Sequence, residues 1–352
     1  MTSLSTVRQQ VLAGIDSHLV RRLAGPLLIL LAAYGIVPLV ADQYVIESLL
    51  LPFLSLSLAA VGLNLLTGSA GQLSLGTAAF MAVGAYGAYN VVLRLPWVPM
   101  LLAFVLGGIA AAAIGIVFGL PSLRLRGFYL AVSTLAAQFF VQWVFTKFSW
   151  FSNDNTSGVI TAPQLRAFGL VFSEPTARYL FCLTVVMLLG LAAERLLATT
   201  TGKHFIAIRD NELAARIIGV PVLKTKITAF ALSSFIIGVA GALWAFAYIR
   251  TVEPHGFNLD RSFQILFIII IGGLGSIRGS FLGAAFIVVL PLVLSRLGSA
   301  IFGGIFDSGV VEMCQRMIIG VLIILFLILE PDGLAAVGRR LGPTLRRLLW
   351  RQ

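Results

Sequence analysis

Long apolar runs follow one another along this chain, and each is close to the length of a helix that crosses a lipid bilayer. A spanning helix needs about 20 mostly apolar residues. Hydrophobic residues make up 59% of the 352 residues and charged residues only 11%, whereas soluble domains hold roughly 25% charged residues. The alternating pattern of a membrane β-barrel does not occur. The sequence therefore predicts an all-α polytopic membrane protein.

Hydropathy, with Pro, Gly and charge as punctuation, predicts about ten spans, and about eight to eleven are compatible with the pattern. The predicted spans lie at residues 23–41, 47–66, 71–91, 98–120, 127–146, 178–197, 227–249, 262–276, 279–297 and 312–330. The first run is longer than the apolar core of a signal peptide, which indicates a retained span. Residues 23–330 are thus the predicted transmembrane domain.

Basic residues gather in three segments of this chain, whose net charge is +11. These segments are the tail 1–22, the loop 198–226 and the tail 331–352. In a polytopic protein Lys and Arg mark the cytoplasmic side, so both termini are predicted to be cytoplasmic. A nucleic-acid partner is not expected, because no soluble basic domain is present. Membrane lipid is the expected environment.

Two loops are long enough to carry structure of their own. The predicted outer loop, 147–177, is rich in turn residues and suits a short helix or a surface loop. The predicted inner loop, 198–226, contains "HFIAIRDNELAARIIG" at 204–219, which has the spacing of one amphipathic helix. Such a helix either lies on lipid headgroups or docks a cytoplasmic partner.

Motifs for nucleotide, metal or catalytic chemistry do not fit this chain. "TTTGKHF" has Leu197 where a P-loop needs its first glycine and His204 where it needs Ser or Thr. The histidines lie on separate segments without metal-ligand spacing. We therefore expect no catalytic residue, metal site or cofactor in this chain. Ionisable groups are rare within the spans, which disfavours a proton-coupled carrier. A self-sufficient secondary transporter coupled to Na⁺, or a channel, stays an alternative. A membrane enzyme is disfavoured.

Glycines and uncharged polar residues are concentrated in "GLNLLTGSAGQLSLGTAAFMAVGAYGAYN", residues 62–90. Glycine weakens a helix but lets helices pack closely. Uncharged polar groups at membrane depth must face protein or water, so we predict a bent or broken segment that lines a cavity. The predicted pathway residues are Asn64, Thr67, Gln72, Ser74, Thr77 and Gln138.

A second glycine constellation, "GGLGSIRGSFLGAAF" at 272–286, loosely echoes "GSAGQLSLGTAAF" at 68–80 and hints at an internal repeat. Both constellations are predicted to pack helices closely. The predicted packing residues are Gly68, Gly71, Gly76, Gly272, Gly273, Gly275 and Gly279.

Four motifs occur in a familiar order: "GLNLLTGSAGQLSLG", "RGFYLAVSTLAAQF", "AIRDNELAARIIGV" and "GGLGSIRGSFLGA". In this order and spacing the chain resembles the LivM-type permeases of bacterial branched-chain amino-acid ABC importers. The resemblance covers about residues 47–330, and "AGQLSLG" is similar to the M-type rather than the H-type subunit of the permease pair.

The resemblance implies a set of partners and a location. A second permease subunit of H type completes the pathway, two cytoplasmic ATPase subunits hold ATP and Mg, and an extracytoplasmic solute-binding protein delivers the solute. The expected location is the bacterial cytoplasmic (inner) membrane. Similar permeases also move urea, short amides or aromatic acids, so these remain alternative solutes.

The resemblance also implies a cytoplasmic coupling helix with a pattern like Glu-Ala-Ala-x-x-x-Gly, which "LAARIIG" matches in part. The residues expected to couple to the ATPase are Arg209, Asp210, Glu212, Ala214, Ala215 and Gly219. Leu213 stands where the glutamate of the pattern belongs, so the acidic contact to the ATPase stays open.

Overall fold

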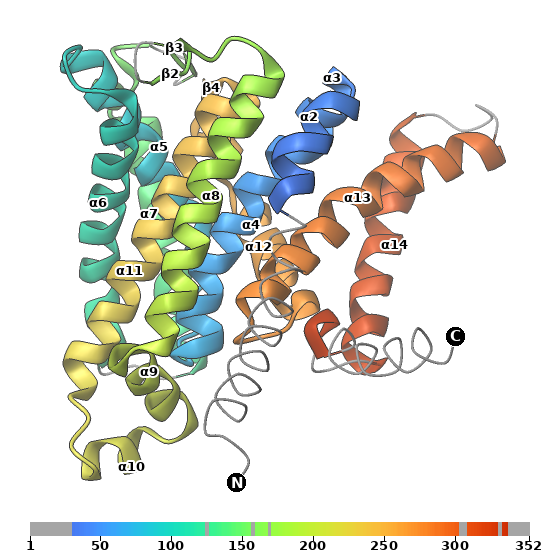
Figure 1. Ribbon diagram of the computed structural model, residues 1–352. Helices are drawn as coiled ribbons and strands as arrows, with labels where there is room; N and C mark the ends of the chain where they lie inside the picture. Colours follow the sequence, from blue (N-terminus) through green and yellow to red (C-terminus); the bar gives the residue numbers. More distant parts are fainter. Residues whose placement is uncertain are drawn as a thin grey trace, which may run out of the picture. The chain divides into compact units, whose positions relative to one another are not determined.

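A computed structural model describes residues 30–123, 127–155, 159–167, 170–302, 308–329 and 333–336, and helices dominate it (Figure 1). The chain divides into two compact units, residues 1–46 and 47–352. The first unit contains η1 (Ala32–Ile36), α2 (Val37–Val40) and α3 (Gln43–Val45). Proline near the start of α2 suits a first helical turn, where no N–H donor is needed. The predicted tail 1–22 and most of 331–352 lie outside the described residues.

The second unit contains the long helices, and η2 (Ile46–Leu50) leads into it. Its helices are α4 (Leu51–Leu63), η3 (Asn64–Ser69), α5 (Thr77–Arg94), α6 (Met100–Gly119), η4 (Leu120–Leu123), α7 (Phe128–Lys147), η5 (Ser149–Ser152), α8 (Pro175–Ala198), α9 (Thr200–Asp210), α10 (Glu212–Ile217), α11 (Val222–Leu243), η6 (Trp244–Ile249), η7 (Pro254–Phe257), α12 (Leu259–Gly272), α13 (Ile277–Phe302) and α14 (Ser308–Leu329). The all-α prediction is confirmed.

Helix α11 packs against α4, α5 and α6, and α12 packs against α13. Glycine allows α5, α6 and α11 to cross at close range. A methyl group on Gly84 of α5 would overlap the carbonyl oxygen of Gly238 on α11, and one on Gly107 of α6 would overlap the carbonyl oxygen of Gly84. The backbones of the three helices therefore touch, as small residues allow in membrane bundles.

Six of the described helical stretches are long and apolar enough to cross a membrane. They are Gln43–Ser69, Met100–Gly119, Phe128–Lys147, Pro175–Ala198, Val222–Ile249 and Ile277–Arg296. Each predicted span from 47–66 onward overlaps a described helix. Helix α12 has only 14 residues, about 21 Å at 1.5 Å per residue, which is short for a hydrocarbon core of about 30 Å. The count of about ten spans stays a prediction.

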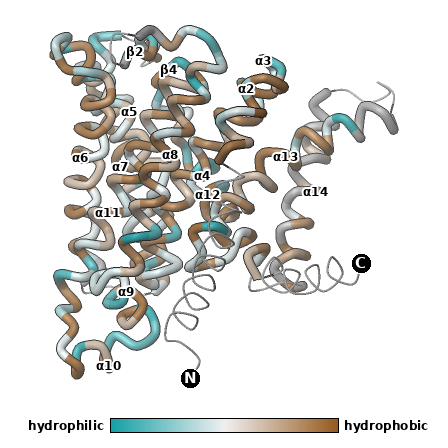
Figure 2. Tube along the Cα trace, viewed as in Figure 1, coloured by the Kyte–Doolittle hydropathy of each residue, from teal (hydrophilic) through white to brown (hydrophobic). Residues whose placement is uncertain are grey.

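Short connections cover the helix ends opposite α9 and α10 (Figure 1). The loop after α7 holds η5, β1 (Ile160–Thr161), β2 (Arg166–Ala167) and β3 (Leu170–Val171). Strand β1 pairs antiparallel with β4 (Thr251–Val252), and β2 pairs with β3. Figure 2 shows apolar residues along the helices and polar residues in these connections and around α9 and α10.

The single amphipathic helix predicted over 204–219 is wrong, because the structure has two helices there. Helix α9 ends at Asp210 and α10 begins at Glu212. Asn211 between them is extended, with φ −159° and ψ 107°, and its side-chain oxygen accepts hydrogen bonds from the N–H groups of Leu213 and Ala214. Asparagine is a favoured N-cap, so it starts a new helix where periodicity alone predicts continuation.

Candidate functional site

The glycine-rich stretch is broken, as predicted. Helical hydrogen bonding stops with η3 at Ser69 and starts again with α5 at Thr77. Gly71 has φ +68°, a left-handed conformation that glycine adopts without strain. Because residues 71–76 are not helical, α5 begins later than the predicted span 71–91. We call residues 70–76 the break.

Asn64, at the start of η3, ties this region to the turn between α12 and α13. Its Nδ2 donates to the carbonyl oxygens of Gly273 at 3.3 Å and Ser276 at 2.9 Å and to Ser280 Oγ at 2.9 Å. Its Oδ1 accepts from the N–H of Gly275 at 2.7 Å. The amide is buried, so all of its hydrogen bonds are made to protein groups in this conformation.

The two predicted glycine constellations therefore meet in space. A methyl group on Gly68 would overlap both Asn64 Oδ1 and the N–H of Gly275. Gly272 and Gly279 approach each other backbone to backbone where α12 and α13 meet. Four predicted packing glycines remain. Gly71 lies in the break, and Gly76 lies against the Thr134 carbonyl of α7. Gly273 and Gly275, both with positive φ, lie in the turn after α12. These contacts account for the density of glycine.

The first turn of α5 is capped by side chains from other helices. Gln138 on α7 accepts a hydrogen bond from the N–H of Ala79 at 2.6 Å, and Ser262 on α12 accepts from the N–H of Ala78 at 2.9 Å. Thr134 on α7 accepts from the N–H of Leu75 at 2.9 Å. The first N–H groups of a helix have no partner within it, so this buried helix start needs these polar residues. Gln138, a predicted pathway residue, thus caps a helix here.

The remaining predicted pathway residues differ in whether their side-chain polar atoms have hydrogen-bond partners within the protein. Thr67 Oγ1 donates to the carbonyl of Gln72 at 3.1 Å, and Ser74 Oγ accepts from the N–H of Gly76 at 3.4 Å. By contrast, both polar atoms of the Gln72 side chain and the Thr77 hydroxyl are buried without a hydrogen-bond partner among the described residues. Such groups are rare in proteins and imply water or another ligand.

Arg209 at the end of α9 reaches into the broken region. Its Nη1 donates to the carbonyl oxygen of Gly68 at 2.9 Å, and its Nε and Nη2 donate to Asp210. The side chain also fills the space that a methyl group on Gly71 would need. Arg209 therefore connects a predicted coupling segment to the predicted pathway.

Glu212 fixes α10 to the start of α11. Its carboxylate lies 3.1 Å from Lys226 Nζ, with side-chain exposures of 15% and 5%, and 3.6 Å from Arg216. Ala215 is buried with Ile208, Val220 and Val222. The two predicted coupling residues Glu212 and Ala215 thus make contacts within the chain, whereas Ala214 and Gly219 are exposed.

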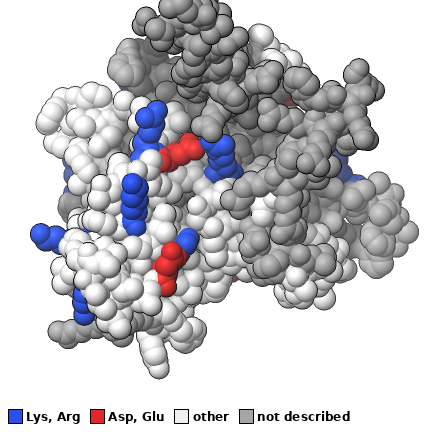
Figure 3. Space-filling view, turned by 60° about the horizontal axis from the view of Figure 1, so that its bottom comes forward, with Lys and Arg blue, Asp and Glu red and all other residues white. Residues whose placement is uncertain are grey.

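Helix α10 presents an apolar face to solvent. Leu213 is 67% exposed, Ile217 is 78% exposed and Ile218, directly after the helix, is 75% exposed. We call these three residues the α10 face. Figure 3 views this end of the molecule, where basic side chains predominate over acidic ones; the exposed basic residues here are Arg195, Lys203, Arg209, Arg216, Lys224 and Arg278.

Three residues that were not among the predicted site residues also take part in these contacts. Ser262 caps α5, Ser280 bonds Asn64 and Lys226 pairs with Glu212. Each lies in or directly before a predicted span, where a polar side chain is expensive and usually has a role. That signal was available in the sequence, but their partners are distant along the chain. Among the described residues, no group of three or more His, Cys, Asp and Glu side chains is placed to hold a metal ion.

Comparison with known proteins adds the family. Residues 45–327 match the model of the branched-chain amino acid transport system permease component. The high-affinity branched-chain amino acid transport system permease protein LivM of Escherichia coli is 30% identical over 302 residues, 79% of this chain and 67% of the relative. A probable LivM of Methanocaldococcus jannaschii is 27% identical over 257 residues, 70% of this chain and 71% of the relative.

A permease named for a different solute is also similar to this chain. The autoinducer 2 import system permease protein LsrC of an Enterobacter species is 28% identical over 224 residues, 62% of this chain and 61% of the relative. No solved structure matches the chain significantly. The match to the family model covers most of the chain, including the break, α9, α10 and the turn after α12. The protein therefore belongs to the family of permease components of branched-chain amino acid transport systems, which are multi-pass membrane proteins.

Proposed function

We propose that this chain is one of two permease subunits of an ATP-driven ABC importer and forms half of the path of branched-chain amino acids across the bacterial inner membrane. Its proposed partners are an H-type permease subunit, two ATPase subunits that hold ATP and Mg, and an extracytoplasmic solute-binding protein. The names of the LivM relatives support this class of solute.

The α10 face carries the proposal. Three large apolar side chains stand in solvent on a helix that Glu212 and Lys226 hold against α11. Exposed apolar patches of this kind mark interaction surfaces. The face lies at the basic end of the molecule, which is the cytoplasmic end by the positive-inside rule, where an ATPase subunit would bind. Arg209 then links that end to the break.

The break and the first residue of α5 supply the proposed pathway. Gln72 and Thr77 have buried polar groups without partners among the described residues, so they are the best candidates for contact with solute or water. Both are uncharged. An importer must release its solute, and weak contacts with amides and hydroxyls in this part of the path are compatible with release. Asn64 and Gln138, with their polar atoms bonded to protein, hold the walls in place.

Association with the ATPase subunits tests the proposal. The double variant Leu213→Ser with Ile217→Ser should reduce co-purification of the ATPase subunits at least about tenfold, because each apolar side chain contributes roughly 1–2 kcal/mol when buried. Trp97→Ser is the control, since Trp97 is 77% exposed and lies in the connection between α5 and α6. Equal recovery of the ATPase with all three proteins would contradict the docking role.

Two activity measurements separate the proposal from its alternatives. The purified chain alone should hydrolyse no ATP, and liposomes that contain only this chain should not take up leucine when an ion gradient is applied. Gradient-driven uptake by the single chain would instead support a self-sufficient secondary transporter.

A further inference from the structure

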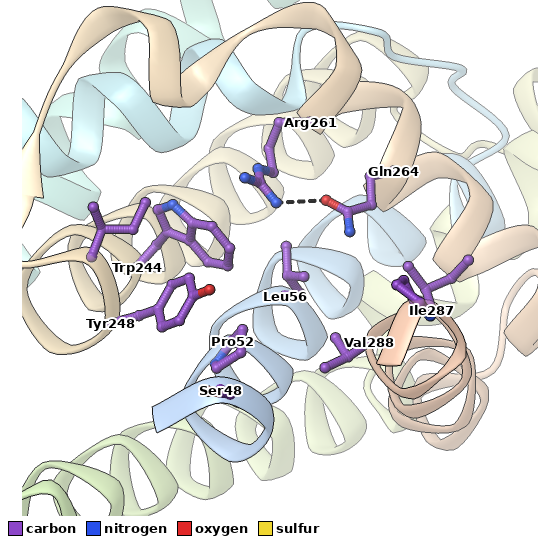
Figure 4. Close-up of a pocket in the computed structure, with 11 residues that line it drawn as sticks. Ser48, Pro52, Leu56, Trp244, Tyr248, Arg261, Gln264, Ile287 and Val288 are labelled. Atoms are coloured by element: carbon purple, nitrogen blue, oxygen red, sulfur yellow. Dashed lines mark hydrogen bonds between the residues drawn. The ribbon is translucent and has the colours of Figure 1, made fainter. Parts of the chain in front are cut away.

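A cavity of about 540 Å³ lies between α4, η6, α12 and α13 (Figure 4). Small-molecule sites commonly measure roughly 300–1,000 Å³. No residue of the break or of the α10 face lines this cavity. Its walls are of two kinds, one polar and aromatic, the other aliphatic.

Arg261 on α12 is the charged residue among those that line the cavity. Its guanidinium carbon lies 4.1 Å from the centre of the Trp244 ring, and its Nη1 donates to Gln264 Oε1 at 2.6 Å. Figure 4 shows the guanidinium above the Trp244 ring and the bond to Gln264. The ring and the amide therefore hold the guanidinium in one orientation.

No described carboxylate forms a salt bridge with Arg261. Its Nε and the Trp244 Nε1 are buried donors that have no acceptor among the described residues. Removing a cation from water is costly unless a charge or hydrogen bonds compensate. Nη2, which does not bond Gln264, is left as the donor of the guanidinium for an anionic group in the cavity.

The aliphatic wall suits the other end of a small acid. Pro52 and Leu56 from α4 and Ile287 and Val288 from α13 line the cavity. An apolar wall facing a fixed cation fits a solute with a carboxylate at one end and an aliphatic side chain at the other. A solute without a carboxylate would place no anionic group against the guanidinium.

We propose that this cavity is a solute subsite in which Arg261 binds the carboxylate of an amino acid, while Leu56 and Ile287 contact its aliphatic side chain. The inference rests on the proposed importer function and adds a specificity-determining residue to it. It also orders the candidate solutes, because urea and short amides carry no carboxylate and should be poor cargo.

Uptake by the complete importer in proteoliposomes tests the subsite. With radiolabelled leucine, Arg261→Gln should lower uptake at least about tenfold, the expected loss for a charge-assisted hydrogen bond, and Arg261→Lys should retain part of it. Arg94→Gln is the matched control, because Arg94 also stacks on a tryptophan, Trp150 at 3.3 Å, but is exposed and does not line the cavity of Arg261.

The outcomes separate the two proposals. If the Arg261→Gln complex takes up leucine as fast as the wild-type complex, the subsite proposal is wrong and the importer proposal is unaffected. Absence of ATP-driven uptake of any carboxylate solute by the wild-type complex overturns the importer itself.

A binding measurement covers the case in which Arg261→Gln does not fold. Leucine added to the purified full chain should change the fluorescence of Trp244, and leucinamide, which lacks the carboxylate, should not. Trp244→Phe should abolish the change and so assign it among the five tryptophans. Equal responses to leucine and leucinamide overturn the subsite.

Discussion

Replacing Asn64 by Ala should destabilise the fold, because its buried amide joins η3 to the turn after α12. The side chain has two donor hydrogens and one acceptor oxygen, which serve Gly273, Ser276, Ser280 and Gly275. Side-chain hydrogen bonds in membrane proteins contribute about 0.6 kcal/mol on average and up to about 1.7 kcal/mol. Three such bonds amount to about 2–5 kcal/mol, because the partners stay buried after the substitution.

The measurement is thermal unfolding of the purified chain in detergent, followed by tryptophan fluorescence. Asn90→Ala is the matched control, because Asn90 Nδ2 donates to Tyr86 of its own helix and to Phe151, while its Oδ1 has no hydrogen-bond partner among the described residues. Asn64→Ala should therefore lower the Tm clearly more than Asn90→Ala. Equal Tm values for the two variants would refute the argument that Asn64 joins η3 to the turn after α12.

Three further substitutions test separate parts of the molecule. Gly84→Ala places a methyl group against a backbone carbonyl of α11 and should lower the Tm or prevent folding, whereas Gly320→Ala, with nothing within 4 Å, should not. Asn211→Ala removes the cap of α10 and should cost about 1 kcal/mol of local stability, measured as faster hydrogen exchange of α10 amides. Lys226→Met leaves the carboxylate of Glu212 without its buried partner, so adding Glu212→Gln should restore part of the lost Tm; a further fall in the double variant would contradict that reasoning.

The helical class and the break were predictable because both depend on local sequence. Apolar runs of spanning length have few alternatives to helices in lipid, and glycine beside Asn64 and Gln72 indicates a departure from helical structure. The partners of Asn64 were not predictable, since Asn64 and Gly273 are 209 positions apart and no periodicity relates them. The loose echo between their two segments was visible, but an echo does not predict contact.

The helix start at Glu212 shows a different limit. Asn211 is followed by an acidic residue, as at many helix starts, yet the spacing of Ile206, Leu213 and Ile217 continued the amphipathic pattern through it. Periodicity and capping chemistry then predicted different structures, and the cap prevailed because Asn211 satisfies two N–H groups of the new helix. Arg261 was missed for another reason: it lies just before the predicted span 262–276, where an arginine is commonly taken as an interfacial anchor.

Arg209 joins regions whose roles were predicted separately. Its bond to the Gly68 carbonyl is the contact of α9 with η3, directly before the break, and the same arginine fills the space beside Gly71. A displacement of α9 by a bound partner must either carry the carbonyl of Gly68 with it or break this bond. Because Asn64 bonds the same turn of η3 to Gly275, Arg209 and Asn64 together connect α9 to both glycine constellations.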